Sequence, residues 1–126
     1  MASELRVNTL KDASGNNSIA TSVVFGGVAK CWGDFDQDTP SVKDSFNTSS
    51  VTDHTTGQYD PQWSSNMGSV NYVTMSQTQP QSVTTSCDSF EDESAKTTGD
   101  TRIQTIENGS ATDHTNNGYA VHGDLA

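Results

Sequence analysis

Large apolar side chains are scarce in this sequence, and their scarcity limits the core that the chain can build. Leu occurs only three times in 126 residues, and Leu, Ile, Val and Phe together number 20. This composition in a charged chain is typical of disordered proteins, or of chains that complete their core by association. The apolar residues nevertheless alternate with polar ones between turn-forming segments, which favours a folded chain. We therefore expect burial between subunits to supply part of its stability.

Positive charge, long apolar runs and cysteine are scarce as well. Lys and Arg number six against 16 Asp and Glu, and the net charge of −10 repels phosphate, which argues against a nucleic-acid partner. No apolar run approaches the roughly 20 residues that span a bilayer, and Glu4 and Arg6 stand where a secretory signal is apolar. We expect no membrane partner and synthesis in the cytoplasm. Cys31 and Cys87 predict free, partly buried thiols, with a bridge between them as the alternative.

The residues that are abundant favour strands over helices. Ser and Thr occur 17 times each, and turn signals recur every 8 to 12 residues. About eight short strands predict an all-β fold, a small antiparallel β-sandwich or barrel. The strands are expected among the segments 4–10, 19–25, 28–35, 42–46, 51–53, 58–60, 70–75, 83–87, 101–106 and 119–122, of which 42–46 and 83–87 have the weakest pattern.

Three details of this pattern are specific enough to test. The segments 51–53 and 58–60 flank a four-residue connection, which predicts a hairpin. The acidic run at residues 88–94 predicts a loop. Trp32 and Phe35 are both expected in the core, and their spacing of three predicts a bulge near Gly33.

No sequence motif for catalysis or metal binding is present. The chain has no GxGxxG, GxxxxGK[ST], HExxH or GxSxG, and a small core leaves little room for an enclosed pocket. We therefore predict that the protein is not an enzyme, with no catalytic residues and no cofactor. His54, His114 and His122 are too widely separated to give a metal-ligand spacing, so solvated turn histidines are expected instead.

One acidic run partly matches a calcium-binding loop. Asp34, Asp36 and Asp38 occupy the first three oxygen positions, but Thr39 replaces the required Gly and Ser45 replaces the closing Glu. We predict a solvated acidic loop and no metal site, with a looser calcium site here or at residues 88–93 as the alternative.

Three aromatic residues allow two interpretations. Tyr59, Trp63 and Tyr72 lie near Asn and Asp residues, a combination that can bind a glycan. Because the chain has few other large apolar residues, the same three side chains are expected to fill the core and the subunit interface.

Four segments of the chain resemble short virion-associated structural proteins, tail-fibre-like or decoration proteins, of phages of aquatic bacteria. They are SELRVNTLKDASGNNS at residues 3–18, GVAKCW at 27–32, DSFNTSSVTD at 44–53 and GDLA at 123–126. In that group the opening segment precedes unrelated C-terminal regions, so the resemblance implies an attachment or trimer-forming element. Residues 77–109 lie outside the resemblance.

The resemblance implies a homotrimeric virion protein, made in the host cytoplasm. It would be a surface-exposed capsid decoration or a short fibre or tail appendage, bound to the major capsid or tail protein. We expect residues 1–17 to be an extended anchor segment that places Leu5, Val7 and Leu10 among neighbouring subunits, and residues 18–126 to be a single β-sandwich domain. The alternative function is a receptor-binding module for host surface glycan.

Overall fold

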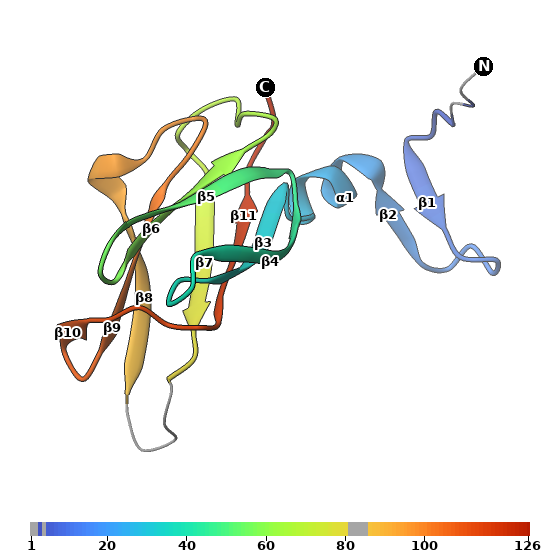
Figure 1. Cartoon of the computed structure of the whole chain (residues 1–126). Coiled ribbons are helices and arrows are strands. Elements are labelled where there is room, and N and C mark those ends of the chain that lie inside the picture. Colours follow the sequence, from blue (N-terminus) through green and yellow to red (C-terminus); the bar gives the residue numbers. More distant parts are fainter. Residues whose placement is uncertain (1–2, 4, 81–85) are drawn as a thin grey trace.

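Two antiparallel sheets pack face to face in the computed structural model, which describes residue 3, residues 5–80 and residues 86–126 (Figure 1). This architecture confirms the predicted all-β sandwich. The strand expected at residues 83–87 falls largely outside the described residues. The first sheet has the order β4 (Ser41–Phe46), β3 (Cys31–Asp36), β11 (Asn117–His122), β7 (Val73–Thr78).

The second sheet is built around a long hairpin. β5 (Thr48–Thr55) and β6 (Gln58–Trp63) form the hairpin that the sequence predicts, but residues 56 and 57 alone connect the strands, in place of the four residues expected. Gly57 lies in this connection with a φ of 70°. A Cβ at Gly57 would lie 2.6 Å from the Thr105 carbonyl oxygen, so both its dihedral and its surroundings require glycine. β6 of this hairpin pairs with β9 (Arg102–Glu107). β9 also pairs with β8 (Cys87–Asp92) and β10 (Ser110–Ala111).

Aromatic side chains form much of the core between the sheets. Tyr59 and Phe35 are almost fully buried, with ring centroids 5.4 Å apart. Trp63 packs edge-on against Tyr72 at 6.2 Å and lies 6.3 Å from the ring of Tyr119. Large rings fill the space that aliphatic residues occupy in most cores, because this chain has so few of the latter.

Polar residues complete the interior. Gln37, Thr105 and Asn117 are buried, and the Thr105 hydroxyl donates to the Gln37 side-chain oxygen at 3.1 Å. The Asn117 amide donates to the His114 carbonyl oxygen at 2.7 Å. Such bonds reduce the cost of burying polar atoms in a core that is short of apolar side chains.

The prediction for Trp32 is wrong. β3 alternates regularly, which places Phe35 inside and leaves Trp32 39% exposed on the outer face. The irregularity lies in the partner strand, because Asp34 pairs Asp44 whereas Phe35 pairs Val42. The bulge therefore belongs to β4, and residues three apart in β3 face opposite sides.

Two further segments differ from the sequence prediction. Most of the strand expected at residues 19–25 belongs instead to the helix α1 (Thr21–Gly27); no described strand pairs with this helix, and a helix bonds its backbone internally. Residues 87–92, expected largely as an acidic loop, form the strand β8, followed by the 3-10 turn η1 (Glu93–Ala95). β8 pairs only β9 among the described strands, and the exposed Asp88 places charge on this edge strand, where it opposes further pairing.

The segment before β3 stands beside the sandwich as an arm (Figure 1). We call residues 3 and 5–29 the arm. Its strands β1 (Thr9–Lys11) and β2 (Ser18–Ala20) form a short hairpin, followed by α1. The predicted domain boundary between residues 17 and 18 falls inside this hairpin, and the first strand of the sandwich begins at Cys31.

Candidate functional site

An apolar row crosses the outer face of the β4-β3-β11-β7 sheet. The strand register places Phe46 beside Trp32, Trp32 beside Ala120, and Ala120 beside Met75. Phe46 and Met75 are 55% and 54% exposed. Large apolar side chains in a contiguous exposed row mark a surface that contacts a ligand or another molecule.

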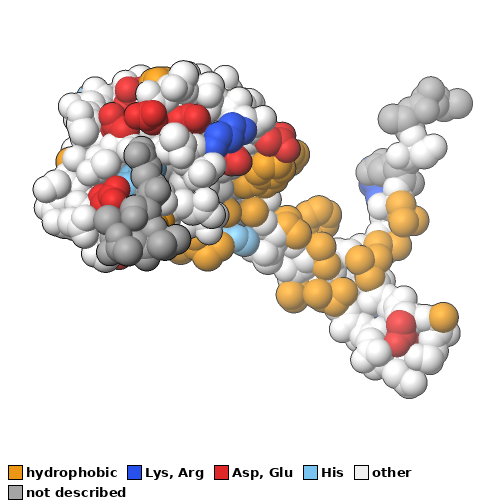
Figure 2. Space-filling model, turned by 60° about the horizontal axis from the view of Figure 1, so that its bottom comes forward, with side chains coloured by type: hydrophobic (Ala, Val, Ile, Leu, Met, Phe, Trp, Pro, Cys, Tyr) orange, Lys and Arg blue, Asp and Glu red, His pale blue; other side chains and the backbone are white. Residues whose placement is uncertain are grey.

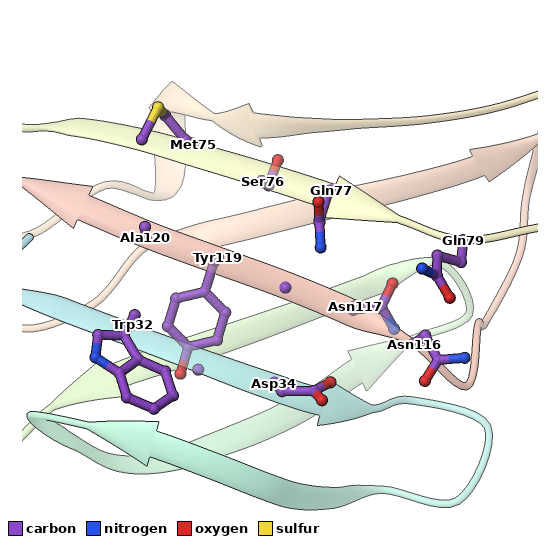
Figure 3. A pocket seen from close by; sticks show the side chains of 12 residues that line it. Trp32, Asp34, Met75, Ser76, Gln77, Gln79, Asn116, Asn117, Tyr119 and Ala120 are labelled. Carbon is purple, nitrogen blue, oxygen red and sulfur yellow. The ribbon is translucent and has the colours of Figure 1, made fainter.

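A groove of about 560 Å³ lies along this face, over β11 (Figure 3). Its floor lies below its sides because β11 presents the small residues Gly118 and Ala120 there. Trp32 from β3 and Met75 and Gln77 from β7 form its sides. We call this feature the sheet groove.

The two ends of the sheet groove differ in chemistry. Figure 3 shows Trp32 and Met75 at one end and Gln79 and Asn116 at the other. The polar end is held by Lys43, whose ammonium donates to the Asn116 side-chain oxygen at 2.6 Å and lies 3.7 Å from a carboxylate oxygen of Asp34. The groove is therefore amphipathic along its length.

Two amides of the sheet groove retain their hydrogen-bonding capacity. Within the described part of the chain, the side chains of Gln77 and Gln79 make no hydrogen bond. Each amide offers two donor hydrogens and an acceptor oxygen. The phenol of Tyr119 is different: it lies beneath the floor, bonds the Thr48 hydroxyl at 2.9 Å, and its pKa is raised by burial.

A second exposed apolar surface covers the arm. Figure 2 shows hydrophobic side chains along the arm and at its junction with the sandwich. Leu5 is 82% exposed and Phe25 is 69% exposed. The other exposed large apolar side chains of the arm are Val7, Leu10, Ile19, Val23 and Val28.

The arm surface continues onto the sandwich through a shallow pocket. Phe25 and Val28 line this pocket together with Phe46 and Leu125. Phe46 also begins the apolar row of the outer sheet face. The arm and that face thus share one apolar surface.

The structure places the predicted anchor residues Leu5, Val7 and Leu10 on the arm, all exposed. The predicted glycan-binding aromatics Tyr59, Trp63 and Tyr72 are 0%, 5% and 4% exposed. Burial corrects the glycan assignment of these three residues, which occupy the core as the alternative interpretation expected. Burial also raises the pKa of Tyr72 to about 12, and its hydroxyl donates to the Thr97 and Asp100 carbonyl oxygens.

The histidines lie apart from one another. The His54 ring nitrogen is 3.8 Å from a carboxylate oxygen of Asp60, whereas His114 is fully buried. Asp34 faces the sheet groove, and Asp36 caps a turn by accepting from the Thr39 amide at 2.9 Å. Within residues 3, 5–80 and 86–126, no group of three His, Cys, Asp or Glu side chains is arranged to hold a metal ion.

Cys31 and Cys87 are both free thiols, as the first of the two sequence interpretations predicts. Burial raises the pKa of the Cys31 thiol. The helices in the described segments are too short and not apolar enough to span a membrane.

The sheet groove was not predicted from the sequence. One signal was present, because Trp32 and Asp34 alternate with buried neighbours and must share a face. The rest of the sheet groove could not be predicted, because no local pattern shows that residues 75–79 and 116–120 lie beside that face.

Comparisons with models of protein families, with curated proteins and with solved structures find no match.

Proposed function

We propose that the protein is a structural subunit that joins a symmetric assembly through its N-terminal arm. The observation that carries this proposal is the run of seven exposed large apolar side chains on an arm that stands beside the sandwich (Figure 2). Apolar surface of this extent is costly in water and becomes stabilising when a neighbouring subunit covers it.

The composition supports the same proposal. A core in which polar residues such as Gln37 and His114 take buried positions contributes less apolar burial per residue than a typical domain. Burial of the arm between subunits would add what the isolated chain lacks. A net charge of −10 keeps the remaining surface from adhering nonspecifically.

The assembly that the sequence resemblance implies is the surface of a bacteriophage particle. There the chain would be a capsid decoration or a short fibre or tail appendage, as a homotrimer bound to the major capsid or tail protein. Quantitative mass spectrometry of purified particles separates these positions. A copy number close to that of the major capsid protein means decoration, and a far smaller number means an appendage.

Removal of arm residues 3–12 tests the anchor. Because the sandwich begins at Cys31, we expect the shortened chain to stay folded and soluble but to lose self-association and incorporation into particles. Sedimentation velocity and particle co-purification measure both losses.

A matched triple variant separates the side chains from the backbone of the arm. Leu5→Ser, Val7→Ser and Leu10→Ser together should reproduce the loss. The control is Val42→Ser with Phe90→Ser, which removes exposed apolar side chains from the sandwich and should leave assembly unchanged. Normal incorporation of both arm variants would refute the anchor.

A further inference from the structure

We propose that the sheet groove binds a neutral oligosaccharide, with Trp32 as the stacking platform. This inference is independent of assembly through the arm, since the residues that form the groove lie on β3, β7 and β11 and on the adjoining loops. The function would be recognition of a sugar polymer by the outer face of the sandwich.

The apolar end of the groove fits the face of a sugar ring. Trp32 is 39% exposed, and its neighbour on β11 is the small Ala120. A sugar ring can therefore approach the indole from the sheet groove (Figure 3). The C–H groups of a pyranose face pack against an aromatic surface, while its hydroxyl groups project from the edge. A flat apolar platform beside polar groups is therefore the arrangement that a sugar requires.

The polar side chains of the groove fit the hydroxyl groups. A hydroxyl both donates and accepts. The amides of Gln77 and Gln79, which make no hydrogen bond to any described residue, offer both functions. Asp34 adds an acceptor, and Lys43 holds it and Asn116 in place. Groups positioned before binding lose less conformational entropy when the ligand arrives.

Charge selects among sugars. Asp34 pairs with Asp44 on the outer face of β3 and β4, and the whole chain carries a net charge of −10. The one cation beside the described groove, Lys43, already contacts Asp34 and Asn116. Uronic or sulfated glycans would meet repulsion without a free cation, so the ligand is neutral.

A protein partner is the competing occupant of this face. It would have to cover the Asp34 carboxylate and the free amides of Gln77 and Gln79, and burial of polar groups is costly unless the partner supplies matching hydrogen bonds. A sugar supplies such bonds along its whole length, which is why the groove favours it.

The full-length chain is titrated with short oligomers of glucose, galactose, mannose and N-acetylglucosamine, and with oligogalacturonate as the anionic comparison. Calorimetry measures binding, and acrylamide quenching of tryptophan emission locates it. Trp63 is only 5% exposed, so the quenchable signal comes from Trp32. We expect at least one neutral oligomer to bind and to protect Trp32, and oligogalacturonate to do neither.

Two variants should weaken binding, because each alters a different part of the sheet groove. Trp32→Ala removes the platform, and Gly118→Leu fills the floor, where the side chain of Gln77 at 3.2 Å is the nearest obstacle. Each should weaken calorimetric binding at least tenfold. Phe90→Ala removes an aromatic ring of similar exposure, 45%, from the other sheet and should bind as the unaltered chain does.

Three results would overturn the proposal: no neutral oligomer binds, Trp32→Ala binds normally, or Trp32 is shielded by self-association in the absence of sugar. The last result would make the groove an interface between copies. A failure of the arm experiments leaves all three measurements unaffected, so the two proposals are separately testable.

Discussion

At the scale of single residues, Glu91 links the two sheets. One of its carboxylate oxygens accepts from the Thr74 hydroxyl at 2.6 Å and from the Thr101 hydroxyl at 2.7 Å. The other accepts from the Lys96 ammonium at 2.9 Å, which also lies 4.3 Å from the centre of the Tyr72 ring. Burial opposes the charge, but these hydrogen bonds outweigh it and hold the pKa of Glu91 below its usual value.

The depressed pKa predicts how stability depends on pH. A carboxyl with a lowered folded-state pKa stabilises the fold above its unfolded pKa, and this contribution is lost as pH falls through the folded value. Glu91→Gln should lower the free energy of unfolding by about 2 kcal/mol at pH 7, with a difference that shrinks below roughly pH 4. Urea unfolding across pH measures it, and Glu93→Gln, at an exposed neighbour, is the control. A deficit that is equally large at pH 3 would assign the effect to shape rather than charge.

At the scale of elements, the arm is held together weakly. β1 and β2 share three residue pairs, and α1 has seven residues without a side-chain cap at its start. Isolated two-stranded hairpins and helices shorter than about 12 residues are marginal in water. The elements of the arm are therefore marginal by themselves, and we expect a neighbouring subunit to stabilise them.

Hydrogen exchange should reveal this difference. In dilute solution, the amides of β1, β2 and α1 should exchange at nearly unprotected rates, and those of β3, β9 and β11 should be the slowest. Raising the protein concentration until subunits associate should protect the arm selectively. Protection of the arm that matches the sandwich at every concentration would show that the arm is stable without a partner.

At the scale of the whole molecule, charge opposes the association that we propose for the arm. The chain carries a net charge of −10, and Figure 2 shows acidic side chains gathered on the sandwich. Salt shortens the range of repulsion between subunits from about 30 Å at 0.01 M to about 10 Å at 0.1 M ionic strength. Burial of apolar side chains is not weakened over this range.

Association should therefore tighten as salt is added. We expect sedimentation equilibrium to give a dissociation constant that falls severalfold between 0.01 and 0.1 M sodium chloride. Sucrose at matched osmolality is the control for effects other than screening. Weaker association in salt would instead indicate that attraction between opposite charges holds the subunits together.

Local sequence patterns were sufficient to predict the fold class and the hairpin at residues 51–60. Alternation of period two is a local property, so strands such as β6 and β9 can be recognised before any partner is known. The scarcity of aliphatic residues likewise indicated that Tyr59, Trp63 and Tyr72 could serve as core. The exposed arm residues Leu5, Val7 and Leu10 stand out for the same reason, since a chain with only three Leu residues places two of them there.

The pairing of strands distant in sequence determines which face of each strand is buried. It also determines which exposed side chains lie side by side on the sheet surface. The alternation of β3 places Trp32 and Phe35 on opposite faces, but the position of the other sheet determines which of the two enters the core. The bulge lies in β4, so the sequence of β3 does not reveal it. Residues 21–27 form a helix, and no described strand pairs with them. The sheet groove exists because β3, β11 and β7 are neighbours, an adjacency set by long-range pairing that no short stretch of sequence contains.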